Sequence, residues 1–299
     1  MPLKNLPLRY KLMVITSGLI VVSLVVLSVI SIRNFTRDKT DLIKLQTNDT
    51  AKLIAEKLKT EIGAKIEALQ VFDRFAGAAG NTDTKKKTRR RKSEGPGPGK
   101  LSAGNGVLRV SRYGFDGGEV RRTYARDNLA EQQKVEISAP AFVRDEERLK
   151  ERLKAVFRGQ TLLLTRTQAF GKPVWFIAFP VIEGEVAQRV VTAYLSTEIL
   201  DSAFGSRAYT SFFVDSDKAL VVHSDKKETL AARNFKDHPA VEFLQGQETR
   251  TGFSIYRNAV TQHEYFGAFS KLDIGATAVV VEIEKDRALE SVNRLRITS

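Results

Sequence analysis

The sequence contains no cysteine, so disulfides, thiolate zinc sites and a cysteine nucleophile are all excluded. Histidine is scarce as well, since the only three are His223, His238 and His263. Their spacing excludes the helical His-x3-His pair of many metal sites. The chain also lacks a Gly-x-Ser-x-Gly elbow or a comparable catalytic pattern. We therefore expect no metal, no cofactor and no catalytic residues, and predict that the protein is not an enzyme.

Acidic residues are fewer than basic ones, 35 against 48, and the formal net charge is +13. Residues 85–100 carry eight lysines and arginines against Glu94, which is more than half of this excess. Because the charge is local and no basic face recurs at helical spacing, we expect no nucleic-acid partner. The sequence GPGPGK in this stretch departs from a phosphate loop, with Glu94 at the first glycine position and Leu101 after Lys100. We predict that residues 77–105 form a basic, Gly/Pro-rich loop.

No charged residue occurs between positions 12 and 32, a run of 21 residues rich in Val, Ile and Leu. This length matches a membrane-spanning helix. The residues that follow offer no small-x-small cleavage site, so a cleaved signal peptide is disfavoured. We predict that residues 1–33 form a cytoplasmic N-terminus and an uncleaved anchor in a bacterial inner membrane, with the C-terminal bulk in the periplasm.

Residues 34–76 are predicted to form a long stalk helix, because they contain no proline and one glycine, Gly63. At 1.5 Å per residue such a helix would rise about 60 Å from the bilayer. Its apolar stripe packs against its own domain, against a second copy, or against both at different heights, and a homodimer is expected. The stripe consists of Leu42, Leu45, Ile54, Leu58, Ile62, Ile66, Leu69 and Phe72.

The remaining sequence reads as two α+β units in tandem. In residues 106–205 two strands, a helix and three strands follow one another, and residues 206–285 repeat this order. Residues 286–299 are predicted to form a C-terminal helix. The fold class is therefore α+β, with a transmembrane and stalk helix followed by two antiparallel five-stranded units.

This order of elements resembles the double-Cache extracytoplasmic sensor domain of bacterial transmembrane receptors, whose two units are PAS-like. The second unit carries the likeness most clearly, in FFVDSDKALVVHSD, DHPAVEFLQGQETRTGFSIYR and HEYFGAFSKLDIGATAVVVEIEKD. The resemblance covers about residues 34–290. It implies a membrane-distal and a membrane-proximal unit, and small-molecule sensing that is signalled by movement of the stalk helix.

The sequence departs from this family in three ways. The basic insert at 85–100 is foreign to the pattern. No second membrane segment or output domain follows Ser299, so we expect either a truncated receptor or a sensor that acts through a partner. In the amino-acid-binding subgroup an aspartate on the last strand of the first unit holds the ligand ammonium, and the matching position here is Tyr194.

Five residues of the first unit are predicted to bind a ligand, because pockets combine apolar walls with a few placed polar groups and an arginine fork suits a carboxylate. Of these, Arg126, Arg166 and Tyr194 are expected to approach one cavity. The alternative is that the aromatic residues are sheet core and the arginines are solvated. The five residues are Tyr124, Arg126, Arg166, Trp175 and Tyr194.

The leading hypothesis is thus a sensing module of a chemoreceptor, cyclase or kinase, with a carboxylate-bearing ligand favoured. A second is a cell-envelope scaffold that uses the fold to hold protein partners without a ligand. A third, a binder of envelope polyanions, depends entirely on the basic loop.

Overall fold

The computed structural model describes residues 7–80, 106–183, 186–205, 208–231, 235–259 and 261–290. Helix α1 (Leu8–Gly80) is one continuous helix of 73 residues, about 110 Å long at 1.5 Å per residue. No proline interrupts it, which explains why the predicted membrane span and the predicted stalk join without a break. The basic segment predicted as a loop lies, from residue 81 to 105, outside the described residues.

The first unit is a five-stranded antiparallel sheet of order β2-β1-β5-β4-β3. The hairpin between its first two strands turns at Gly117 and Gly118, whose positive φ angles glycine tolerates best. Three helices lie between β2 and β4 in the chain: α2 (Leu129–Val135), α3 (Ala139–Phe157) and α4 (Thr167–Phe170). The strands are β1 (Val107–Asp116), β2 (Glu119–Asp127), β3 (Leu162–Thr165), β4 (Val174–Glu183) and β5 (Val186–Ser196).

The second unit repeats this order as β7-β6-β10-β9-β8. The short 3-10 helix η2 (Thr197–Ala203) leads into it, and α5 (Lys226–Ala231), α6 (Pro239–Gln245) and α7 (Lys285–Ala288) accompany it. Its strands are β6 (Thr210–Val214), β7 (Leu220–His223), β8 (Thr251–Arg257), β9 (Glu264–Lys271) and β10 (Ala278–Glu284). The predicted α+β fold of two tandem PAS-like units is confirmed. Of the predicted C-terminal helix, residues 291–299 lie outside the described part.

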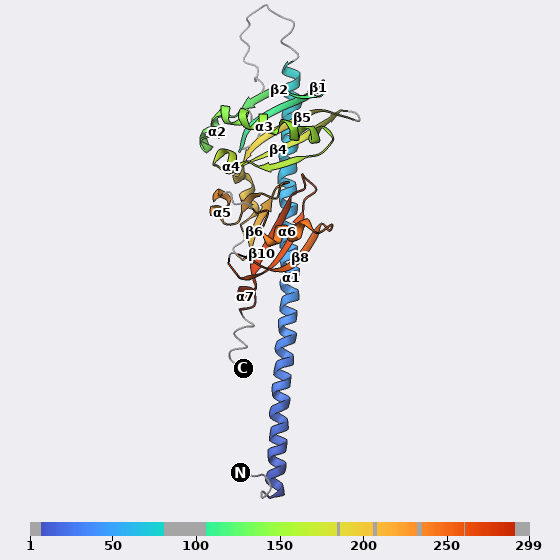
Figure 1. Ribbon diagram of the computed structural model, residues 1–299, viewed down its shortest axis with the longest axis vertical. Coiled ribbons are helices and arrows are strands. Elements are labelled where there is room, and N and C mark those ends of the chain that lie inside the picture. Colours follow the sequence, from blue (N-terminus) through green and yellow to red (C-terminus); the bar gives the residue numbers. More distant parts are fainter. Residues whose placement is uncertain are drawn as a thin grey trace, which may run out of the picture.

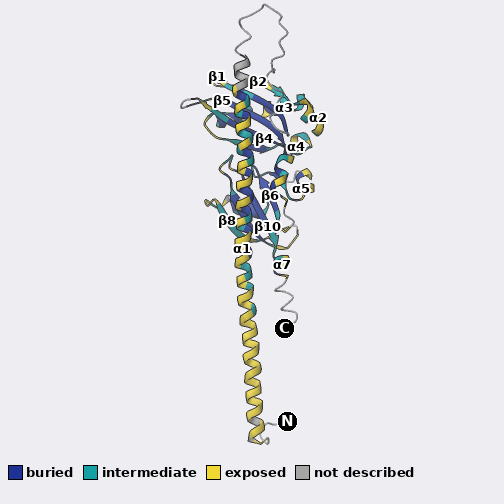
Figure 2. Cartoon of the chain, turned by 180° about the vertical axis from the view of Figure 1, so that it is seen from behind, coloured by how far each residue is buried: buried dark blue, intermediate teal, exposed yellow. Residues whose placement is uncertain are grey.

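Helix α1 runs along one face of both sheets and then continues alone below them (Figure 1). Leu58, Ile62 and Leu69 of α1 are buried in one cluster with Trp175 of the first sheet and Val281 of the second. The lower part of the helix is exposed along its length (Figure 2). The stalk stripe is thus covered by the same chain in its upper half.

The opposite face of each sheet is covered by that unit's own helix. Phe142 and Leu153 of α3 pack on the first sheet, and Val241 and Leu244 of α6 pack on the second. Because successive strand residues point to opposite faces, each strand contributes one set of side chains to α1 and the other set to α3 or α6. The two faces are therefore separate candidate locations for a site.

Candidate functional site

Two adjacent acids of α3, Asp145 and Glu146, face the first sheet instead of solvent. They follow Phe142 by three and four residues and precede Leu149, so they fall within the apolar stripe of the helix. Their exposed fractions are 3% and 2%. Two buried carboxylates require partners, since an unpaired buried charge is strongly unfavourable.

Asp145 is held by three donors from the sheet side. Arg166 uses Nε, at 2.8 Å from Oδ2, and Nη2, which contacts Oδ1, so the guanidinium grips both carboxylate oxygens. The Tyr194 hydroxyl donates to Oδ2 at 3.0 Å. Burial is the largest single influence on the pKa of Arg166 and lowers it, but the hydrogen bond to Asp145 and the charge of Asp145 together raise the pKa by more, so the net direction is upward. Burial and the charge of Asp145 likewise raise the pKa of Tyr194, so its hydroxyl remains a donor.

Glu146 is held by a second set of donors. Arg109 donates from Nε at 2.9 Å and from Nη2 at 3.2 Å, Arg122 donates from Nη1 at 2.7 Å, and the Ser111 hydroxyl donates as well. Arg109 also reaches Asp127 at 2.7 Å. Glu146 thereby joins β1 and β2 to α3.

The five sequence-predicted residues divide between the two faces of this sheet. Arg166 and Tyr194 meet at Asp145 on the α3 face. Trp175 belongs to the core that α1 shares, Arg126 lies 5.7 Å above the Phe72 ring of α1, and the Tyr124 ring lies 6.3 Å from the same phenylalanine. These three residues therefore contact the stalk helix.

The prediction that Arg126, Arg166 and Tyr194 approach one cavity is wrong. In the register of the sheet, Arg126 is opposite Val110, while Tyr194 is opposite Arg109. Neighbouring residues of one strand point to opposite faces, so Arg126 and Tyr194 do too. The spacing of residues within one strand shows which of them lie on the same face of that strand. The pairing between strands decides which residues of different strands lie on the same face of the sheet.

Asp145, Glu146, Arg109 and Arg122 were missed as functional candidates. The signal that could have identified the two acids is their place in the helix, between Phe142 and Leu149 on the apolar side. A charged pair within a helical apolar stripe indicates buried ions with partners on the packed sheet.

The two units meet at a polar junction formed by β3 of the first and the β6–β7 turn of the second. Asp215 is buried and accepts hydrogen bonds from the backbone N–H groups of Thr165 at 2.6 Å, Asp217 at 2.8 Å and Ala219 at 2.9 Å. Burial raises its pKa to about 6, although these hydrogen bonds oppose the rise. Asp217 forms a bidentate ion pair with Arg152 of α3, with N–O distances of 2.6 and 2.8 Å.

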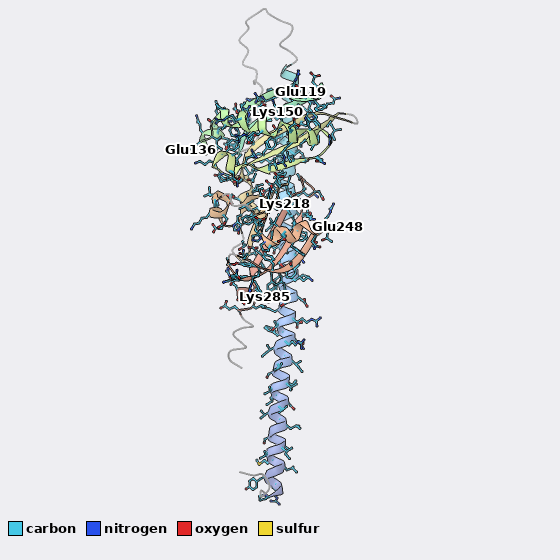
Figure 3. All side chains as sticks on the ribbon, in the orientation of Figure 1. Glu119, Glu136, Lys150, Lys218, Glu248 and Lys285 are labelled. Atoms are coloured by element: carbon cyan, nitrogen blue, oxygen red, sulfur yellow. The ribbon has the colours of Figure 1, made fainter. Side chains whose placement is uncertain are left out.

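Beside these contacts lies a cavity of about 250 Å³ between the units. Arg166 belongs to its lining, so the residue that binds Asp145 also borders the cavity. Lys218, labelled in Figure 3, lies on the same turn and donates to the carbonyl of Ala276 at 2.9 Å. The cavity is lined by Leu164, Thr165, Arg166, Thr167, Gln168, Ala169, Asp215, Asp217, Ala219, Leu220 and Lys236.

The second unit carries its own buried polar group, between β10 and α6. The Tyr256 hydroxyl contacts the carboxyl of Glu282, and His238 Nε2 lies 3.8 Å from that carboxyl. Burial raises the pKa of Glu282 to about 7 and lowers the pKa of His238 to about 4. His238 is therefore neutral at any pH at which Glu282 is charged, so the two residues do not form an ion pair although they lie close together.

Within the residues that the structure describes, no group of three or more His, Asp or Glu side chains is arranged to hold a metal ion. In the same part of the chain α1 is the one helix that is long and apolar enough to cross a membrane by length and composition. The apolar stretch lies near its N-terminus, and none of it is buried.

Among solved structures, this chain is similar to the ligand-binding domain of the Pseudomonas fluorescens chemoreceptor CtaA in complex with L-isoleucine, at 15% identity and a TM-score of 0.48. That match covers 87% of this chain and 98% of the other. The extracellular domain of soHK1S-Z6, described as a histidine kinase, matches at 12% identity and a TM-score of 0.49, covering 85% and 98%. The ligand-binding domain of PctB from Pseudomonas aeruginosa PAO1, in complex with L-Arg, matches at 13% identity and a TM-score of 0.47, covering 82% and 97%.

No protein-family model and no curated protein matches the sequence.

Proposed function

We propose that this chain is the extracytoplasmic small-molecule sensing module of a bacterial membrane receptor of the chemoreceptor, cyclase or kinase type. The observation that carries the proposal is the continuity of α1, a single helix that packs on both sheets and extends beyond them as an exposed apolar stretch. Residues 12–32 then anchor the chain in the inner membrane, and both units lie in the periplasm.

Signalling in this proposal depends on α1 as the common element of both units. Arg126 and Trp175 of the first sheet contact α1, and Val281 of the second sheet shares its core. A ligand can shift the position of α1 only if it binds one arrangement of the first unit more tightly than another. The contacts to α1 provide the path by which such a difference reaches the membrane span.

The proposed ligand bears a carboxylate, because Arg166 and Tyr194 already converge on one. The arginine presents Nε and Nη2 to two oxygens, and the tyrosine adds a third donor. The receptor neighbours crystallised with L-isoleucine and L-Arg bind ligands that carry a carboxylate, which agrees with this class of ligand.

The test is a thermal-shift screen of the full chain in lipid nanodiscs against a library of carboxylates. A ligand that binds only the folded protein must raise the melting temperature. Arg166→Ala should abolish the shift, while Arg121→Ala, at an exposed arginine of the same unit, should retain it. If no carboxylate shifts the wild type, the sensing proposal fails and the ligand-free scaffold takes its place.

A further inference from the structure

We propose that Asp145 is an internal carboxylate ligand of the first unit, and that a free carboxylate binds by replacing Asp145 on Arg166 and Tyr194. The exchange by a natural ligand depends on the proposed function, whereas the existence of the carboxylate site does not. The ligand class is a small monocarboxylate that reaches the site from the cavity between the units.

The donors form a complete recognition site for a carboxylate. Arg166 binds both oxygens in the fork geometry that favours planar carboxylates, and Tyr194 donates to one of them at 3.0 Å. Both donors come from the sheet side of the unit, Arg166 from the end of β3 and Tyr194 from β5. Only the acceptor comes from α3, so the donors would be satisfied equally by a carboxylate that is not attached to this helix.

The surroundings make an empty site unfavourable. Tyr194 is buried and its ring packs edge-on against Phe142 and Phe170. If Asp145 leaves, the hydroxyl of Tyr194 loses the acceptor at 3.0 Å in a place that excludes water. The guanidinium of Arg166, whose side chain is 20% exposed, loses its counter-ion at the same time. Binding of another carboxylate would restore both the acceptor for Tyr194 and the counter-ion for Arg166.

Access distinguishes Asp145 from its neighbour Glu146. Arg166 borders the 250 Å³ cavity together with Thr165 and Thr167, and its side chain is 20% exposed, so a small anion can approach this residue from the junction of the units. Of the donors to Asp145, Arg166 borders that cavity and Tyr194 does not, whereas none of the donors to Glu146 borders it. We therefore assign exchange to Asp145 and a permanent structural role to Glu146.

The acids that line the same cavity do not prevent an anion from entering. Asp217 is neutralised by the bidentate pair with Arg152, and three backbone N–H groups point to Asp215. Lys236 adds a positive charge to the lining. Arg166 is thus the group in this lining that offers an exchangeable carboxylate partner.

The experiment is chemical rescue of Asp145→Ala in the full chain in nanodiscs, with sodium formate as the probe. Truncation to alanine removes the carboxylate, and formate has the size of the group removed. The variant should melt below the wild type, and formate should restore most of the loss in a saturable way. Sodium chloride at equal ionic strength should not. The double variant Asp145→Ala with Arg166→Ala should show no response to formate.

Asp145→Asn fills the same volume and serves as the folding control, without a response to formate. If Asp145→Ala does not melt cooperatively in buffer, formate should restore a cooperative transition. The proposal is overturned if formate and chloride act alike on Asp145→Ala, or if this variant stays unfolded in formate while Asp145→Asn folds. A response of Asp145→Ala to formate, combined with a failed ligand screen of the wild type, would remove the sensing function and leave the site.

Discussion

At the scale of single residues, the buried ions of the first unit occur in matched groups. Glu146 accepts hydrogen bonds from Arg109, Arg122 and Ser111, and Arg109 also forms an ion pair with Asp127. Such a group contributes little net stability compared with an apolar core, but removal of one member leaves an uncompensated buried charge. Folding stability is therefore lost when one member of this group of buried ions is removed.

We predict that Arg109→Ala lowers the free energy of unfolding by about 3–5 kcal/mol, because Glu146 remains buried without its main counter-ion. Urea unfolding of the full chain in detergent would measure this, with fluorescence of the single, buried Trp175 as the probe. Arg121→Ala is the matched control and should cost less than about 1 kcal/mol, because the Arg121 side chain is 64% exposed. Equal effects of the two substitutions would contradict the structural role of Glu146.

A second residue-scale prediction concerns pH and Glu282. The pKa of this carboxyl is 4.5 in its ordinary state and about 7 in the fold, so the folded protein favours the protonated form. Its contribution to stability is complete below pH 4.5 and is lost as the pH rises through 7. Glu282→Gln keeps an acceptor for Tyr256 and carries no charge. Above pH 7 it should therefore be more stable than the wild type by about 3 kcal/mol, since one pKa unit corresponds to about 1.4 kcal/mol.

The measurement is the difference between the unfolding free energies of Glu282→Gln and the wild type from pH 4 to pH 8. The contribution of Asp215, in another part of the unit, cancels in this difference. His238 lies 3.8 Å from the carboxyl of Glu282, but its lowered pKa of about 4 puts its titration below the pH range in which the difference grows. The difference should grow with pH. Glu248→Gln, at an exposed position of the same unit, should follow the wild type throughout. A flat difference for Glu282→Gln would show that the carboxyl is not buried in solution.

At the scale of elements, α1 changes its surroundings along its length. Ala51, Leu58, Ile62 and Leu69 are buried by the sheets, whereas Leu53 on the outer side is 71% exposed. The same helix is therefore a core element of both units on one side and a solvated surface on the other. A substitution on α1 has an effect that depends on its side of the helix, even when the residue type is the same.

We predict that Leu58→Ala costs about 2–5 kcal/mol of unfolding free energy, because it opens a cavity in the core that α1 shares with the sheets. Leu53→Ala, five residues earlier on the exposed side, should change it by less than about 0.5 kcal/mol. Both variants can be compared by urea unfolding in detergent. A similar loss in the two variants would mean that α1 is not packed on the sheets as described.

At the scale of the whole molecule, the lower part of α1 has apolar residues that its own units leave uncovered. Leu42 and Leu45 are 49% and 61% exposed, while Ile43 between them packs with Phe266 and Leu289. A second copy that pairs along this side of the helix would cover both leucines near the membrane. This agrees with the proposed homodimer.

We predict that Leu42→Cys and Leu45→Cys each crosslink between chains in membranes under mild oxidation, because each position would face the same position of the second copy. The chain has no other cysteine, so any crosslink must form at the introduced one. Crosslinking is measured by non-reducing gel electrophoresis. Ile43→Cys is the control and should crosslink poorly, since its side chain is buried within the chain. Efficient crosslinking at residue 43 without crosslinking at 42 or 45 would exclude this pairing.

The sequence by itself determined the long helix α1, the order of the strands and one main helix in each unit, but not the short helices α2, α4 and α5. These features depend on local patterns, such as the proline-free stretch of α1 and the turn residues Gly117 and Gly118 between β1 and β2. Of the five residues predicted to bind a ligand, Arg166 and Tyr194 do meet, at Asp145, while ligand binding by them stays a prediction.

Only the tertiary structure decided which residues share a face. Arg126 pairs with Val110, and Tyr194 pairs with the neighbouring Arg109. These pairings put the two predicted ligand-binding residues, Arg126 and Tyr194, on opposite faces of one sheet. A shift of one residue in strand pairing reverses the face of every side chain, and this register depends on contacts between distant parts of the chain. The same long-range packing brings Asp145 onto Arg166, which no local pattern specifies.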